Sequence, residues 1–268
     1  MKPVLVTLAH DPQGLLLPHL QALTDPLKRL FGQAYLSIGP VTWLKQSERI
    51  EQLAQDEFFQ IVEHATDLPV GEDLRQLYTY AAEHCAPETI LHLCFADRVA
   101  FALRSEQRNA FCRAVEDLRA EETPLLFQRS AWAWAAHPAN YQRIEGIVTE
   151  VGELLYGKRF DFAWCHLAVQ AGSLRAVLPH TTQTDFSICA ELVLLLRDSL
   201  ATKDVDWLTW EDPFLLQRDG AQLKQEREQD PSETRKRLHY ALPMLQVLYE
   251  YAGGYEWTGL RIKDFVKG

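Results

Sequence analysis

The chain has 268 residues, of which 47% are apolar and 24% charged, a composition typical of a globular protein rather than a disordered or fibrous one. Its 27 Lys and Arg against 37 Asp and Glu give a formal net charge of -10, which disfavours general binding to nucleic acid or anionic lipid. Apolar runs fall far short of the roughly 20 residues of a membrane span. With no secretory signal before the first strand-like run, we expect a cytoplasmic protein.

The first half alternates strand-like runs of β-branched and aromatic residues with segments of helical period. This pattern predicts parallel strands linked by crossover helices. The expected strands are Val4–Ala9, Tyr35–Ile38, Phe58–Val62, Thr89–Phe95 and Pro124–Gln128. The expected helices are Gln13–Phe31, Lys45–Gln55, a segment after Asp67–Gly71 that presents Leu74, Leu77, Tyr78 and Ala81 on one face, and Ser105–Ala120.

The second half begins with an irregular aromatic segment, followed by a helix with an apolar stripe from Ile144 to Leu155 that ends at Gly157. Phe160–Val169 is strand-like, Phe186–Leu200 helical, and Asp206–Gly220 an acidic loop that contains tryptophans. The last helix starts at Asp230 with Pro231 in its first position, is expected to kink at Pro243 and ends at Gly253–Gly254. The mixed charges of Lys224–Arg237 indicate a solvated helix face.

The five cysteines are odd in number, widely spaced and never in a C-x-x-C pair, which argues against a disulfide framework or a zinc knuckle. We expect these cysteines to be reduced residues of the core. They are Cys85, Cys94, Cys112, Cys165 and Cys189.

The pair Asp97–Arg98 follows the apolar strand Thr89–Phe95 and therefore lies at a carboxyl end of the sheet, the edge at which open α/β sheets bind ligands. A carboxylate there can face a cation or a phosphate-bearing ligand, and the guanidinium can pair with a phosphate. The structural alternative is a turn that caps the next helix.

This succession of strands and helices resembles the GT-A fold of nucleotide-diphospho-sugar glycosyltransferases, in which the fourth strand leads to a D-x-D motif. Phe95-Ala96-Asp97-Arg98 stands in the place of that motif, after Val4–Pro12 and after Gly71 with Arg75, and Trp210-Glu211-Asp212 comes late in the chain. The resemblance implies an α/β fold with a three-layer open mixed sheet and a C-terminal helical segment. A single domain, 1–268, would comprise a nucleotide-binding half, 1–130, and an acceptor half, 131–268.

The resemblance also implies a nucleotide-sugar site made by His10, Asp11, Arg75, Asp97 and Arg98. For His10 and Asp11 the alternative is a structural turn and cap. The motif implies Mn or Mg at Asp97, but Phe95 takes the place of the first Asp. With one protein carboxylate, retention of a hard cation would depend heavily on the diphosphate.

Acceptor-binding candidates are Trp132, Trp134, His137 and Trp210, because aromatic faces suit sugar stacking and an imidazole can bind a hydroxyl. The alternative for the first three is a core strand edge. Glu211 or Asp212 could take the proton from an attacking acceptor hydroxyl, and the alternative is a solvated acidic turn.

The sequence thus predicts a glycosyltransferase-like protein that transfers a sugar from a nucleotide sugar to a small-molecule or glycan acceptor. The alternative is a catalytically silent module with the same fold that serves in binding or scaffolding.

Overall fold

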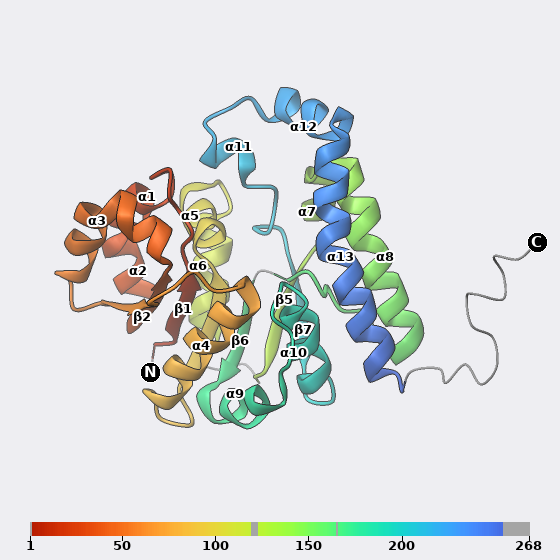
Figure 1. Ribbon diagram of the computed structural model, residues 1–268, viewed down its shortest axis with the longest axis horizontal. Coiled ribbons are helices and arrows are strands. Elements are labelled where there is room, and N and C mark those ends of the chain that lie inside the picture. Colours follow the sequence, from red (N-terminus) through yellow and green to blue (C-terminus); the bar gives the residue numbers. More distant parts are fainter. Residues whose placement is uncertain (1, 119–122, 165, 254–268) are drawn as a thin grey trace, which may run out of the picture.

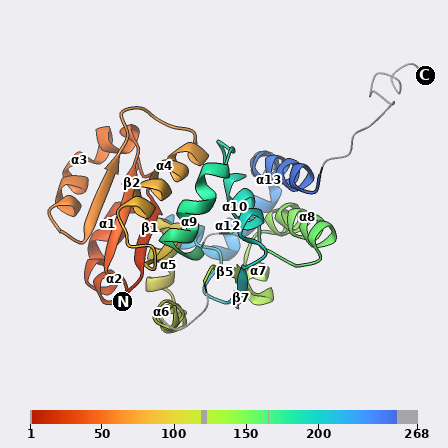
Figure 2. The same ribbon diagram turned by 90° about the horizontal axis from the view of Figure 1, so that it is seen from below.

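The computed structural model describes residues 2–118, 123–164 and 166–253 (Figure 1). Helices cover both faces of a single sheet (Figure 2), which makes an α/β protein with three layers. The described residues form the strands β1 (Val4–Leu8), β2 (Gln33–Ile38), β3 (Phe59–Glu63), β4 (Ile90–Phe95), β5 (Leu125–Arg129), β6 (His166–Gln170) and β7 (Ala201–Val205). The first five predicted strands are confirmed with small shifts of their ends.

The strand order is β3-β2-β1-β4-β6-β5-β7. Neighbouring strands are parallel except where β6 pairs antiparallel with β4 on one side and with β5 on the other. In the β4–β6 pair Leu93 lies opposite Leu167 and Cys94 opposite His166. Because β6 runs backwards, its first residue lies at the same edge as the last residues of β4 and β5.

Each face of the sheet has its own apolar core, because successive side chains of a strand point to opposite faces. Val6 belongs to one core and Leu5 to the other. The Val6 core contains residues of α4 (Val70–Glu83), α8 (Ala139–Tyr156), α9 (Ala171–Val177), α10 (Ile188–Leu196) and α13 (Pro231–Tyr251). The Leu5 core contains residues of α1 (Leu17–Ala22), α2 (Thr24–Leu30), α3 (Pro40–Ala54), α5 (Ala96–Arg104) and α6 (Arg108–Asp117).

The remaining helical elements are short or lie outside the two layers. They are α7 (Ala131–Ala136), the 3₁₀ turn η1 (Leu178–His180), α11 (Asp212–Leu215) and α12 (Gly220–Gln229). None of the helices in the described ranges combines the length and the hydropathy needed to cross a bilayer.

One helix prediction in the first half was wrong, because the segment Gln13–Phe31 forms two short helices, α1 and α2, which meet at Leu23. The predicted helix Ser105–Ala120 is confirmed as the shorter α6, and its residues 119–120 lie outside the described ranges. The preceding helix α5 was not predicted, although its buried Ala96, Val99, Ala100 and Leu103 follow the helical i, i+3, i+4, i+7 pattern. Asp97 is therefore in the first turn of a helix and not in a loop.

Several elements of the second half also differ from the prediction. The segment Ser130–His137 is helical, because Ser130 caps α7 by accepting the N–H of Ala133. Only the last part of Phe160–Val169 is strand, and only 188–196 of Phe186–Leu200 is helix. Gly157 ends α8 with φ of 70°, and Asp230 caps α13 with Pro231 in the first turn, both as expected. Helix α13 continues past Pro243.

The prediction of a solvated helix face over Lys224–Arg237 is confirmed for most of these residues, which are exposed, but not for Glu233 and Arg237. This segment spans two helices, α12 and the start of α13, which meet at Asp230. The Arg237 side chain is only 20% exposed and pairs with Glu145 of α8. Helices α8 and α13 lie side by side (Figure 1), so the inner face of α13 is available for such contacts.

Gly152 of α8 tests the packing of this helix, because a Cβ atom at this position would overlap the Phe162 ring. We expect Gly152→Ala to lower the free energy of unfolding by about 1–3 kcal/mol through overpacking. Gly146 is the matched control, since it lies in the same helix and a Cβ there meets no heavy atom within 4 Å. Gly146→Ala should stabilise by about 0.5–1 kcal/mol through helix propensity. Urea unfolding measures both, and equal stability of the two variants would contradict the packing described.

Candidate functional site

A cavity of about 280 Å³, here called the edge cavity, lies at the carboxyl edge of the sheet, beyond the ends of β4 and β5. Helices α8, α10 and α13 and the segment after β7 complete its wall. The lining residues are Phe95, Asp97, Arg98, Arg129, His137, Glu145, Val148, Ala163, Trp164, Phe186, Cys189, Trp210, Glu211, Asp212, Lys236, Arg237, Tyr240, Ala241 and Met244. Both the predicted strand-end pair and the predicted late acidic cluster therefore face one space.

Three carboxyl groups, Asp97, Glu211 and Asp212, share this wall with the guanidinium of Arg98. Arg98 forms an ion pair with the buried Glu211 and donates to the carbonyl of Thr209 at 3.2 Å. One Asp97 oxygen accepts the backbone N–H of Arg98 at 2.8 Å. Burial raises the pKa of Glu211 to about 8, against the opposing effect of Arg98, and it raises the pKa of Asp97 as well. Near neutral pH Glu211 therefore keeps a proton that a solvated glutamate would have lost.

His137 and Trp210 line the edge cavity, and each has one buried polar atom without a hydrogen-bond partner in the protein. The His137 side chain is buried, and its Nδ1 lies 2.9 Å from the carbonyl oxygen of Ala133. Since a carbonyl only accepts, Nδ1 carries the hydrogen. Burial lowers the pKa of His137, so the ring is neutral and Nε2 offers a lone pair. The buried Trp210 Nε1 offers an N–H. A ligand hydroxyl can satisfy either atom, because it both donates and accepts.

A chain of buried ion pairs supports another part of the wall, through Arg129, Glu145 and Arg237. Arg129, the last residue of β5, binds Asp161 through Nε and Nη2, both at 2.7 Å, and binds Glu145 at 2.6 Å. Glu145 also accepts from Arg237 at 3.0 Å. The guanidinium of Arg129 lies 3.7 Å from the centre of the Trp134 ring. Paired in this way, the two guanidinium groups hold β5, α8 and α13 in fixed positions around the cavity.

The predicted residues after β1 do not line the edge cavity. His10 is exposed. The buried Asp11 accepts the backbone N–H groups of 15–17 at 2.7–2.8 Å, so its carboxylate caps the segment that enters α1. This arrangement is the structural alternative considered for Asp11.

Arg75 of α4 also lies away from the edge cavity. It donates to Thr181 Oγ1 at 3.0 Å and to the carbonyl of Gln183 at 2.5 Å. The N–H of Gly71 donates to the carbonyl of Thr184, and a Cβ at Gly71 would lie 2.5 Å from that backbone. The segment 181–184 thus packs on the start of α4 and occupies the groups that the family pattern assigns to a nucleotide.

Of the predicted aromatic residues, Trp210 lines the edge cavity, but Trp132 and Trp134 do not. Trp132 is 58% exposed. The two indoles lie on helix α7, so they do not share one side as they would in an extended strand.

The sequence matches no protein-family model and no curated protein. The structure is similar to that of glucosyl-3-phosphoglycerate synthase from Mycobacterium tuberculosis in complex with uridine diphosphate, with a TM-score of 0.51 and 10% sequence identity. The match covers 96% of this chain and 82% of the synthase chain. The chain has a GT-A-like fold. At this identity, the likeness concerns the fold alone.

The divalent cation common in GT-A-like folds does not fit the residues at Asp97. Phe95 supplies no ligand at the first motif position, and one Asp97 oxygen is bound to the helix backbone. In the described part of the chain, Asp97, Glu211 and Asp212 are not grouped closely enough to share one ion. A hard cation needs several oxygen ligands, so no chemical step is assigned to a metal here.

Sequence reasoning missed Arg129, Glu145, Asp161 and Arg237. One signal was present for Glu145, which interrupts the apolar stripe of α8 between Ile144 and Val148. A charged residue on a core-facing position requires a buried partner. Its partner Arg129 is 16 residues away and the second acid, Asp161, is 32 residues from Arg129, so the pairing depends on the tertiary fold.

The proton on Glu211 predicts a specific dependence of stability on pH. A folded-state pKa of about 8 against the usual 4.5 means that folding binds a proton. The contribution of Glu211 is therefore fully present at low pH and is lost as pH rises from about 4.5 to about 8. Glu211→Gln should flatten the fall in unfolding free energy over this range, as measured by urea unfolding at several pH values.

Glu226→Gln is the control for this measurement. Glu226 is exposed and pairs with Arg218, and the hydrogen bond from Arg218 lowers the pKa of the Glu226 carboxyl. The control should keep the wild-type slope. A Glu211→Gln slope equal to that of the wild type would show that Glu211 is ionised throughout this range.

Proposed function

We propose that the protein binds a nucleotide-activated sugar at the carboxyl edge of its sheet and transfers the sugar to a hydroxyl acceptor in the edge cavity. The proposal rests on the unpartnered Nε2 of His137 and Nε1 of Trp210, two buried polar atoms that belong to residues lining the cavity. Buried polar atoms without a protein partner are uncommon and costly. Their position beside Asp97 and Glu211, in a GT-A-like fold, supports a hydroxyl-bearing ligand.

In this proposal Arg98, at the start of α5, faces the diphosphate of the nucleotide sugar, together with Asp97. His137 and Trp210 bind oxygen atoms of the acceptor or of the transferred sugar. The proposal gives no ligand contact to Asp11 and Arg75, because their polar atoms are bound within the protein. His10, Trp132 and Trp134 lie outside the cavity wall and also receive no role.

The transfer step needs a base for the acceptor hydroxyl. The hydroxyl oxygen attacks the anomeric carbon, the bond from that carbon to the diphosphate oxygen breaks, and the diphosphate leaves with the electron pair. We assign the departing proton to the carboxylate of Glu211, with Asp212 next to it in the chain. A carboxyl with a pKa of about 8 is a stronger base than a solvated one, and it acts only when ionised. The rate should therefore rise with pH toward about 8.

A catalytically silent module is the second candidate. It is favoured by Phe95 at the first motif position and by the segment 181–184, which occupies Gly71 and Arg75. A measurement of catalytic turnover distinguishes the transferase from the silent module. Transfer predicts release of free diphosphate nucleotide from a sugar nucleotide in the presence of hydroxyl acceptors, and loss of that release in Glu211→Gln. The silent module predicts binding without release.

Binding is tested by thermal unfolding with UDP, GDP, UDP-glucose and GDP-mannose, each with and without manganese. UDP comes first because the similar synthase structure contains uridine diphosphate. A ligand at a hundred times its dissociation constant should stabilise the protein by about 2.7 kcal/mol. We expect one of these ligands to stabilise the wild type without manganese, because the donor set does not fit a hard cation.

Asp97→Ala and Trp210→Phe should each weaken this binding by about tenfold or more, the cost of a lost buried hydrogen bond. Asp198→Ala, at a side chain that is 96% exposed, and Trp132→Phe are the matched controls and should bind as the wild type does. No stabilisation by any of the four ligands, or equal binding by Asp97→Ala and Trp210→Phe, would reject the proposed site.

A further inference from the structure

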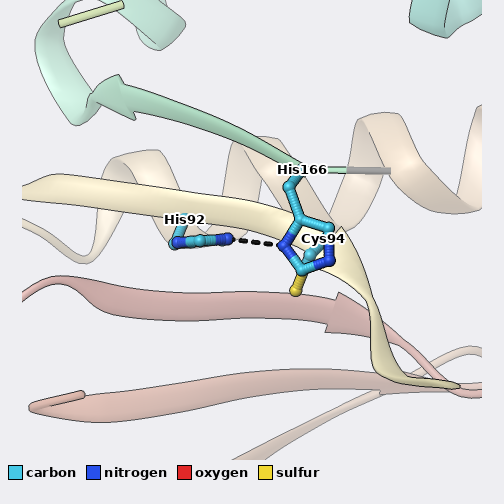
Figure 3. A group of neighbouring side chains, drawn as sticks. All are labelled: His92, Cys94 and His166. Atoms are coloured by element: carbon cyan, nitrogen blue, oxygen red, sulfur yellow. Dashed lines mark hydrogen bonds between the residues drawn. The ribbon is translucent and has the colours of Figure 1, made fainter. Parts of the chain in front are cut away.

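Three potential metal ligands, His92, Cys94 and His166, lie together inside the core (Figure 3). His92 and Cys94 are two residues apart on β4 and point to the same face, and His166 lies opposite Cys94 on the antiparallel β6. The two histidines are 0% exposed and Cys94 is 1% exposed. Within residues 2–118, 123–164 and 166–253 this is the one group of its kind.

The ligand atoms are close enough to share one ion after small rotations. One atom from each side chain lies within 4.8 Å of the others, and His92 Nε2 is 2.8 Å from His166 Nδ1. Bonds of about 2.0–2.1 Å to nitrogen and 2.3 Å to sulfur place ligand atoms roughly 3.3–3.6 Å apart around one zinc ion. The three side chains therefore need to shift by about 1 Å at most, within the reach of rotations about their χ angles.

The two imidazoles are incompletely satisfied by the protein. His92 Nδ1 and His166 Nε2 have no hydrogen-bond partner, although both are deep in the core. Both rings lie wholly inside the core, where an unpaired imidazolium is disfavoured, so both are neutral. Two neutral rings carry two protons on four nitrogens, which leaves each ring with a lone pair. Neutral imidazole is the form that binds metals.

The surroundings of the cluster are aromatic. The rings of Phe31, Phe111, Phe127 and Trp207 pack around the two histidines. Two imidazoles and one thiolate suit soft or borderline ions and not Mg or Mn. The cluster also lies close in sequence to the edge cavity on both strands. Phe95 of the cavity wall follows Cys94 directly, and Trp164 of the wall precedes His166 by two residues.

We propose that His92, Cys94 and His166 form a structural site for one thiophilic cation, Cu(I) or Zn(II), which joins β4 to β6. Binding releases the thiol proton of Cys94 to solvent, and the cation takes one lone pair from each ring. The ring proton between the facing nitrogens moves to the outer nitrogen of the same ring. The site is independent of the proposed transfer reaction, since none of its ligands lines the edge cavity.

The test uses the full chain, reduced and freed of metal, then refolded with Zn(II) alone or with Cu(I) alone, since the site is closed in the folded protein. We expect one ion per chain, a raised unfolding midpoint, and an X-ray absorption spectrum of the wild type that contains one sulfur and two imidazole ligands. Cys94→Ser should weaken binding by about a hundredfold or more, beyond the loss usual for outer-shell changes. Cys112→Ser, at a half-buried cysteine outside the cluster, should bind as the wild type does.

The Zn(II) and Cu(I) arms show which ion the site prefers. A spectrum without sulfur, a stoichiometry well below one for both ions, or undiminished binding by Cys94→Ser would overturn the proposal. The spectrum of the wild type decides even if Cys94→Ser does not fold.

Discussion

The antiparallel pairing of β4 with β6 is the constraint on which the rest of the structure depends. Among the described residues, this pairing joins β3-β2-β1-β4 to β6-β5-β7 within the sheet. Because β6 runs against its neighbours, the end of β4, the start of β6 and the end of β5 meet at one edge. The edge cavity, with residues contributed by 95–98, 129 and 163–164, follows from that reversal.

Charge at this edge is arranged in two different ways. Arg129 and Arg237 are paired with Asp161 and Glu145, so their positive charges are largely balanced within the wall. Buried ion pairs of this kind contribute little net stability, and breaking one is costly because a charge is left unpaired. On the other side Arg98 faces more carboxyl groups than it can neutralise. A proton is therefore retained on that side, where acid–base chemistry would be useful.

The sequence predicted the strands best, because buried parallel strands are continuous apolar runs that need little tertiary information. It also placed Asp97, Arg98, Glu211, Asp212, His137 and Trp210 among the candidates, and all six line the edge cavity. The resemblance implied a mixed sheet but not which strand runs antiparallel, since nothing in His166–Gln170 encodes its direction. Short helices after a strand, such as α5 and α7, were missed because their apolar periods are too short to stand out.

Residues whose role depends on a distant partner were the hardest to predict. Asp11 and Arg75 resemble ligand-binding residues in sequence, but helix entry and the segment 181–184 take up their hydrogen bonds. Arg129 and Arg237 resemble surface charges, but they are buried beside acids from other elements. In each case the deciding contact joins elements that only the folded chain brings together.

The most direct test of the account is hydrogen–deuterium exchange of the wild type with and without saturating UDP-glucose. If the ligand binds at the edge cavity, amide exchange should slow at 96–99, 208–212 and 236–241, which are far apart in sequence and line one space. Slowed exchange confined to other segments, or unchanged exchange in these three segments, would contradict ligand binding at the edge cavity.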